Sequence, residues 1–265
     1  MRWHGFGLTR AWHGRDPLLL AGAVLLALSP LLALLAGLDG RSLFGRSPWD
    51  KPLRFALSLG VYAVTMALAA QWLSSRRRVP GWRGLSPVVL AALVFEMGWI
   101  AVQAARGVDS HFNERTAFEA LMFSLMGAGA ATLSLGTLWL GIVAGRMLSG
   151  AFMTQDRLIA LGIALGFVST GLLLPWTGEA LVDVGRSQTA IGTGWAVPVL
   201  GWRVDGSDPR PAHFVAAHLM QALPLAAIAL AAGARHRRPG LPQATLAGLT
   251  AALVGLTIAL MPRAA

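Results

Sequence analysis

The chain contains no cysteine, and this absence excludes disulfides, thiolate-bound metals and iron–sulfur clusters. Lysine is nearly absent too: Lys51 is the only one, and its place at the start of an apolar stretch argues against a retinal-type Schiff base deep in a membrane span. Charged residues make up 13% of the chain, whereas a soluble domain carries roughly a quarter. Because the apolar residues form long blocks, the composition predicts an integral membrane protein.

The formal charge of +10 raises the question of a nucleic-acid partner. The basic residues, however, lie between the apolar blocks, and no stripe of basic residues with interleaved aromatics is present. Loop arginines of this kind orient a membrane protein and contact anionic headgroups. We therefore expect membrane lipids as partners and no nucleic acid.

Seven apolar stretches are long enough to cross a hydrocarbon core of about 30 Å as helices. The first follows three arginines like a signal peptide, but it is too long for a signal-peptide core and no small-x-small cleavage site follows it, so we expect a retained helix. The sequence thus predicts an all-α integral membrane fold. The expected spans are about 17–38, 51–73, 85–106, 117–143, 157–174, 211–232 and 242–261.

The loops between these spans predict the orientation. The short loops at 74–84 and 233–241 are almost purely basic, whereas the loops on the opposite side mix arginine with acidic residues. The positive-inside rule then places the N-terminus inside and the C-terminus outside a bacterial inner (cytoplasmic) membrane. We expect a cytoplasmic segment at 1–16, one membrane domain at 17–261 with a long outer loop at about 175–210, and a short outer tail at 262–265.

Small residues and prolines inside the spans predict how the helices pack. The pairs Gly141/Gly145 and Gly162/Gly166 are GxxxG motifs, which let a helix approach its neighbour closely. Pro30 and Pro224 fall inside spans, and each predicts a kink whose freed carbonyl needs another partner.

Three of the six histidines, His111, His213 and His218, fall at one face of the membrane in this topology. Imidazole is costly in hydrocarbon and is the commonest side-chain ligand for a metal or haem iron. His213 and His218 are five residues apart, about 7.5 Å along a helix and about 140° around it, so they cannot grip one metal side by side. A ligand shared by these histidines must therefore bridge the third and sixth helices through His111.

Other polar residues lie inside the spans. Glu96 and Gln103 are seven residues apart and share a face of the third helix, and Gln221 projects between the directions of the two histidines of the sixth helix. An intramembrane carboxylate such as Glu96 is a candidate proton relay, ion ligand or neutral buried acid. The structural alternative is a protonated acid that hydrogen-bonds a neighbouring helix.

The first functional hypothesis is redox work by a bound haem b or metal ion near the outer leaflet. In the haem form, His111 and His218 are the axial ligands, and Lys51, Arg54 or Arg106 pairs with the propionates. Such a protein needs a redox or membrane-protein partner. Tryptophans at the outer interface suit a porphyrin pocket, although tryptophan is also the usual interfacial anchor.

The second hypothesis is a metal-dependent intramembrane hydrolase. His111, His213 and His218, with Glu119 or a nearby aspartate, resemble a catalytic zinc site with an open position for water. Seven helices with three histidines are superficially similar to the intramembrane hydrolases related to alkaline ceramidases and progestin/adipoQ receptors. Those proteins carry HxxxH on the last helix, whereas this chain has HxxxxH on the sixth, so we infer no membership.

Two further hypotheses stay open. A transporter would use Glu96, Gln103, His218 and Gln221 to line a path for a proton or small solute, although we find no inverted repeat. A non-catalytic membrane subunit would use the same residues only to tie its helices together.

Overall fold

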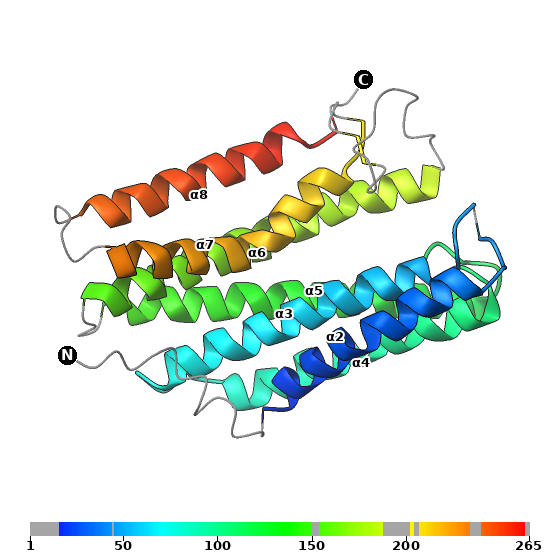
Figure 1. Ribbon diagram of the computed structural model, residues 1–265, viewed down its shortest axis with the longest axis horizontal. Coiled ribbons are helices and arrows are strands. Elements are labelled where there is room, and N and C mark those ends of the chain that lie inside the picture. Colours follow the sequence, from blue (N-terminus) through cyan, green and yellow to red (C-terminus); the bar gives the residue numbers. More distant parts are fainter. Residues whose placement is uncertain are drawn as a thin grey trace. The chain divides into compact units, whose positions relative to one another are not determined.

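The computed structural model is all-helical over the residues it describes, which are 16–43, 45–149, 154–187, 202–203, 207–233 and 240–262. Each of its seven helices contains a segment long and apolar enough to cross a membrane, so the chain is a multi-pass helical membrane protein (Figure 1). The predicted fold class and number of spans are confirmed. The helices are α2 (Pro17–Leu38), α3 (Asp50–Ser74), α4 (Trp82–Arg106), α5 (Ala117–Met147), α6 (Thr154–Ser187), α7 (Arg210–Gly233) and α8 (Leu241–Ala259).

The largest difference from the predicted spans is in α6. We expected this helix to end at about 174 and a loop to begin at Pro175, but the helix continues through that proline to Ser187. Proline is tolerated inside membrane helices because neighbouring groups satisfy the carbonyl that it frees. The loop predicted at about 175–210 therefore begins later than expected, and most of what remains of it, like most of the predicted segments 1–16 and 262–265, lies outside the described residues.

The chain divides within α5 into two compact units, unit 1 up to Leu133 and unit 2 from Ser134. In unit 1, α2, α3 and α4 all contact one another (Figure 1). A Cβ added at Gly22 of α2 would lie 2.9 Å from the carbonyl oxygen of Gly60 in α3, so the two backbones touch there. The Tyr62 hydroxyl donates a hydrogen bond of 2.9 Å to the Leu133 carbonyl oxygen and so ties α3 to α5.

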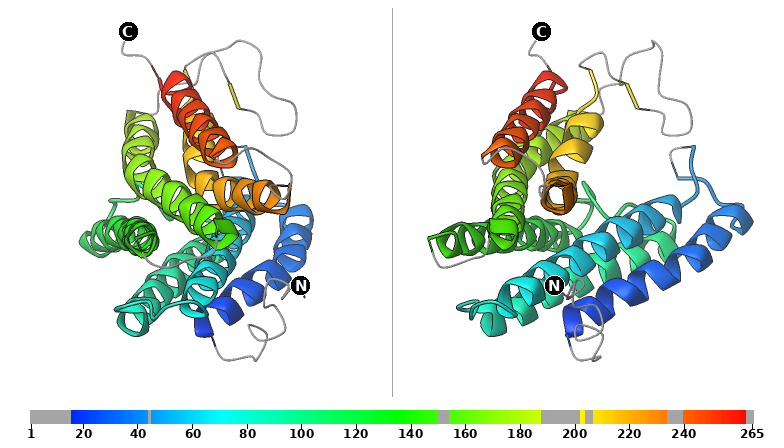
Figure 2. Two further views of the ribbon diagram at one scale, coloured as in Figure 1. Left: turned by 90° about the vertical axis from the view of Figure 1, so that its left-hand side faces the viewer. Right: turned by 60° about the vertical axis from the view of Figure 1, so that its left-hand side comes forward.

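In unit 2, α6 packs along α7, and α8 contacts both, as Figure 2 shows from two sides. The predicted GxxxG packing is confirmed here: a Cβ at Gly162 would meet the Ala227 Cβ at 2.4 Å, and one at Gly166 would lie 2.6 Å from the Leu219 carbonyl oxygen. Gly141 makes an equally close approach to the backbone of Val168. Bare glycines thus bring these helices into backbone contact.

Candidate functional site

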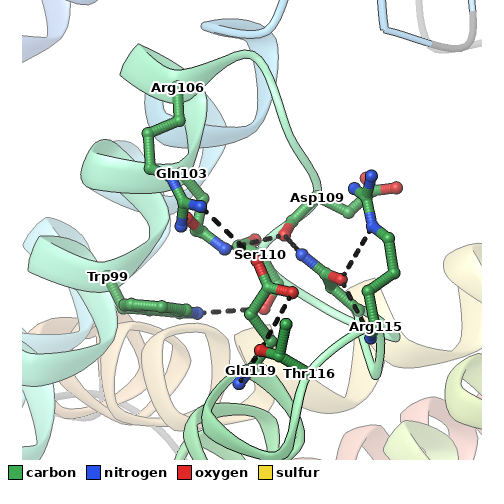
Figure 3. Close-up of polar contacts among 9 residues, drawn as sticks. Trp99, Gln103, Arg106, Asp109, Ser110, Arg115, Thr116 and Glu119 are labelled. Atoms are coloured by element: carbon green, nitrogen blue, oxygen red, sulfur yellow. Dashed lines mark hydrogen bonds and ion pairs between the residues drawn. The ribbon is translucent and has the colours of Figure 1, made fainter.

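The loop between α4 and α5 in unit 1 is held by side chains of α4. Gln103 donates from Nε2 to the Asp109 carbonyl oxygen at 3.2 Å, and Trp99 donates from Nε1 to the Ser110 carbonyl oxygen at 3.2 Å (Figure 3). Asn113 donates a third bond, of 3.3 Å, to the Asp109 carbonyl oxygen. Gln103 and Trp99 lie four residues apart, one turn of α4, so a single helix face fixes the loop.

The far end of this loop is fixed by the start of α5. The Thr116 hydroxyl accepts a hydrogen bond from the Glu119 backbone N–H at 3.1 Å and donates to the Glu119 carboxylate at 3.4 Å, which is a variant of the capping box (Figure 3). Arg106 donates to Gln103 Oε1 at 2.6 Å and lies 3.6 Å from Glu119. Arg106 and Glu119, predicted as propionate and metal ligands, thus already contact each other.

His111 stands at the centre of this loop inside an aromatic cage. The rings of Phe55, Phe112 and Phe123 have their centroids 5.9, 6.2 and 6.0 Å from the imidazole. Phe112 adopts a φ of 57°, an uncommon conformation for a residue with a bulky side chain, so the loop is strained where it presents the histidine.

The cage sets the charge of His111. Burial lowers the pKa of its imidazole to about 3, with a further contribution from the positive charge of Lys51. His111 is therefore neutral at physiological pH. Its Nδ1 lies 3.1 Å from the Ser110 hydroxyl, and either atom can donate that hydrogen bond.

Lys51, at the start of α3, interacts electrostatically with three residues of unit 1, namely Glu96, Asp109 and His111. Burial raises the pKa of Asp109, and the charges of Lys51 and Arg115 partly oppose that shift. The predicted partner Arg54, one turn further along α3, is exposed.

Glu96 is buried in α4, with 4% of its surface exposed. It packs against α5 at Gly129, where an added Cβ would lie 2.6 Å from the Glu96 Oε1 atom. That oxygen is buried and has no hydrogen-bond partner among the described residues. Gln103, on the same face, is fully buried, so the predicted polar face of the third helix points into the protein.

In unit 2, the beginning of α7 is fixed by a buried aspartate. The Asp208 carboxylate accepts hydrogen bonds from the backbone N–H groups of Arg203 and Arg210 at 3.0 and 2.9 Å. It also forms an ion pair with the Arg210 guanidinium at 2.7 Å. Burial alone would raise the pKa of Asp208, but the bonds from Arg210 and Arg203 outweigh it and lower that pKa. Asp208 therefore remains ionised and caps α7, which carries the two histidines.

His213 joins α7 to α6. Its Nδ1 lies 3.2 Å from the Thr177 hydroxyl oxygen, and that hydroxyl is 3.0 and 3.2 Å from the carbonyl oxygens of Leu173 and Leu174. Because the single hydroxyl proton is directed at those carbonyls, Thr177 accepts from the His213 Nδ1–H. His213 therefore uses Nδ1 as a structural donor between helices.

One turn further along α7, a threonine of α6 enters the backbone of the helix. The Thr170 hydroxyl donates to the Ala216 carbonyl oxygen at 2.9 Å and accepts from the Met220 N–H at 3.0 Å. These two backbone groups would bond each other in a regular helix, so Thr170 is inserted between them. Together with Pro224, which lacks the N–H that would bond the Met220 carbonyl oxygen, this insertion interrupts the backbone hydrogen bonding of α7 on both sides of Met220, although the helix continues from Arg210 to Gly233.

His218 lies at this interruption. Its Nδ1 is 2.7 Å from the Phe214 carbonyl oxygen, which can only accept, so Nδ1 carries the proton. The imidazole packs on the Phe214 ring with centroids 4.0 Å apart, and that ring contacts Trp202 at 5.3 Å.

The predicted site residues thus fall into two groups. Unit 1 brings Lys51 and Glu96 together with His111, and unit 2 holds His213, His218 and Gln221 on one helix. Within the described part of the chain, no three histidine and acidic side chains form a group that could hold a metal ion. A ligand shared between His111 and His218 stays a prediction, as does the zinc site.

Several residues of these groups did not emerge from the sequence. Thr116 is one of them, although the Thr-x-x-Glu pattern that it forms with the predicted Glu119 is a capping-box signal in the sequence. Thr170, Thr177 and the phenylalanines around His111 had no comparable signal, since their roles depend on contacts between helices. No family model, curated protein or solved structure matches this chain.

Proposed function

We propose that this protein is a redox protein of the bacterial inner membrane that binds haem b, with His218 as an axial ligand. The observation that carries the proposal is the hydrogen bond of 2.7 Å from His218 Nδ1–H to the Phe214 carbonyl oxygen. This bond leaves the lone pair of a neutral imidazole on Nε2. Histidines that ligate metals usually donate their other ring N–H in this way, because the bond fixes the ring and raises the basicity of the ligating nitrogen.

The surroundings of His218 also fit a porphyrin. The Phe214 and Trp202 rings give an apolar, aromatic wall beside the imidazole. The Thr170 hydroxyl bonds the backbone of α7 within two residues of His218, so the backbone bonding of the helix is irregular beside this imidazole. A bound haem would supply an iron that changes its oxidation state by one electron.

For His111, which belongs to unit 1, the role of second haem ligand stays a prediction from the sequence. Its neutral imidazole can ligate without losing a proton, since its pKa of about 3 lies far below physiological pH. Lys51, Arg54 or Arg106 would pair with the propionates. Of these three, Arg106 already contacts Gln103 and Glu119, whereas Lys51 is half-buried and interacts electrostatically with His111.

The orientation follows from the loop between α3 and α4. Arg76, Arg77 and Arg78 of this loop and Arg83 in the first turn of α4 are exposed, and exposed arginines at the end of a span contact anionic headgroups. We propose that this loop is cytoplasmic, with the N-terminus inside and the C-terminus outside. A reporter that is active only in the periplasm should then be active when fused to the C-terminus, and its inactivity there would contradict this orientation.

The haem proposal is tested by spectra of the protein purified in detergent from cells supplied with haem precursor. The wild-type protein should show a Soret band that shifts on reduction, and His218→Ala should lose it. His213→Ala is the matched control, because it removes a histidine of the same helix whose Nδ1 bonds Thr177 of α6. This variant should keep the Soret band. His111→Ala should convert a six-coordinate spectrum into a five-coordinate one. A colourless wild-type protein, or an unchanged band in His218→Ala, would overturn the proposal.

A further inference from the structure

The two ends of unit 1 differ in how their charged side chains are balanced. At the end with the loop between α4 and α5, arginines pair with acids. Arg41 lies 2.6 Å from Asp39, and Arg106 lies 3.6 Å from Glu119. At the opposite end, where α3 ends and α4 begins, four arginines are exposed. They are Arg76, Arg77, Arg78 and Arg83, and we refer to them as the α3–α4 arginine patch.

Among the described residues of unit 1, a single acid lies at the end that carries this patch, and its oxygens already have partners. Asp16 precedes α2 and accepts hydrogen bonds from the backbone N–H groups of Leu18 and Leu19 at 3.0 and 3.4 Å. Its second carboxylate oxygen accepts from Nε2 of Gln71 at 3.5 Å. Four arginines and one aspartate therefore leave a surplus of positive charge at this end of the described unit.

The four arginines do not all have the same surroundings. The guanidinium of Arg76 lies 3.8 Å from the centroid of the Trp72 ring, and its Nη1 donates to the Trp72 carbonyl oxygen at 3.2 Å. This stacking fixes one positive charge against the end of α3. The side chains of Arg77, Arg78 and Arg83 form no ion pair within the part of the chain that the structure describes. Their guanidinium N–H groups face outward and can donate to an external anion.

The turn between the two helices keeps these arginines close to the membrane. It spans only residues 75–81, and the backbone N–H of Arg77 bonds the Leu73 carbonyl oxygen of α3. Val79, in the middle of the turn, is buried. Because α3 and α4 are both long and apolar enough to span the membrane, a turn folded back on their ends lies at the depth of the lipid headgroups.

The group that fits the patch is a phosphate held at the same depth. Guanidinium groups bind phosphate oxygens through two parallel hydrogen bonds as well as through charge. An anionic phospholipid such as phosphatidylglycerol offers a phosphate with no cation of its own, whereas the headgroup of phosphatidylcholine carries a positive charge that would meet the arginines. Charge complementarity therefore favours the anionic lipid.

We propose that the α3–α4 arginine patch is a binding site for anionic phospholipids, in which Arg77, Arg78 and Arg83 contact the lipid phosphates. A bound lipid supplies the counter-charge that the described residues of this end lack. A basic residue near an anionic surface contributes a factor of about five to binding. The site is separate from His218, and the proposal does not depend on the binding of haem.

The site is tested by native mass spectrometry of the detergent-purified protein, titrated with dioleoyl phosphatidylglycerol or with dioleoyl phosphatidylcholine. The two lipids share their acyl chains, so a difference in Kd reports the headgroup. Wild-type protein should bind phosphatidylglycerol more tightly, and added salt should reduce this preference. The combined variant Arg77→Gln, Arg78→Gln, Arg83→Gln should raise the Kd for phosphatidylglycerol by about ten-fold or more and leave the Kd for phosphatidylcholine unchanged.

Single variants give a matched comparison. Arg78→Gln should raise the Kd for phosphatidylglycerol by about five-fold, whereas Arg115→Gln, which removes an exposed arginine from the other end of unit 1, should leave it unchanged. Because the substituted side chains are exposed, every variant should keep the helical circular dichroism signal of the wild type. Equal binding of the two lipids by wild-type protein, or equal losses in Arg78→Gln and Arg115→Gln, would overturn the proposal. So would displacement of phosphatidylglycerol by inorganic phosphate at the same concentration, because the site would then serve a free phosphate.

Discussion

Removing the Thr170 hydroxyl is the sharpest test of how α6 packs against α7, because this group forms two hydrogen bonds with the α7 backbone. Thr170→Val keeps the shape of the side chain but removes its bonds to the Ala216 carbonyl oxygen and the Met220 N–H. Both backbone groups belong to residues that are buried, at 0% and 1% exposed. The valine methyl occupies the position of the hydroxyl, so α7 cannot simply close and restore its own bond.

The expected cost follows from these two bonds. A buried polar group left without a partner costs about 1–3 kcal/mol. Hydrogen bonds between membrane helices average about 0.6 kcal/mol and reach about 1.7 kcal/mol, because the backbone partly relaxes. With two bonds lost at one site, we expect Thr170→Val to lower the free energy of unfolding by about 1–3 kcal/mol.

The assay is reversible unfolding in mixed micelles, with the helical circular dichroism signal followed as denaturing detergent is added. Thr250→Val is the matched control in the same unit. Its hydroxyl bonds only the Leu246 carbonyl oxygen of its own helix at 2.8 Å, and that carbonyl keeps its backbone partner. The control should change stability by less than about 0.5 kcal/mol. Equal stability of Thr170→Val and Thr250→Val would refute the insertion of Thr170 into α7.

Two further predictions concern packing and pH. Gly162→Leu should separate α6 from α7 and lower the free energy of unfolding by about 1–3 kcal/mol or more, because even a Cβ there meets the Ala227 Cβ at 2.4 Å. Gly98→Leu, at a position with open space, should leave stability nearly unchanged in the same unfolding assay. Equal losses of stability in the two variants would contradict the close approach of α6 and α7. His111 has a folded-state pKa of about 3, below the ordinary value of 6.5, so its contribution to stability is present above pH 6.5 and is lost as the pH falls toward 3. Between pH 7 and pH 5 the wild-type protein should therefore lose about 2 kcal/mol that His111→Asn does not lose, and parallel pH profiles of the two proteins would contradict the neutral, caged imidazole.

The number of spans and most of their bounds could be predicted from the sequence. The long apolar blocks predicted all seven spans, and the ends of α2 and α4 at residues 38 and 106 agree with the expected ones. The error at Pro175 arose because proline ends helices in water, where the freed carbonyl can bond solvent, but is carried inside membrane helices when neighbours satisfy it.

The candidate site was predictable only in its residue types. His111, His213, His218 and Glu96 stand out because ionisable side chains are costly near hydrocarbon. What each one does depends on partners from other helices that no local pattern identifies. The hydrogen bond of His213 to Thr177 joins α7 to α6. The hydrogen bond of His218 Nδ1 to the Phe214 carbonyl oxygen leaves Nε2 of His218 available to a ligand.

The assignment of Glu96 as an intramembrane acid followed from its position in the span, but its neighbours did not. Gly129, against which Glu96 packs, lies on the next helix, so this contact exists only in the folded unit. The sequence therefore predicted a polar residue that needs an explanation, and the fold shows it buried against Gly129 of α5.

The central claim, that His218 ligates a haem, is tested most directly by the ratio of haem to protein in matched preparations of wild type and His218→Ala. Both proteins should be purified under identical conditions with haem supplied in excess. The account predicts stoichiometric haem in the wild type and loss of haem in His218→Ala, with His213→Ala close to wild type. Haem-free wild-type protein that is folded and stable, or equal haem in His218→Ala, would contradict it.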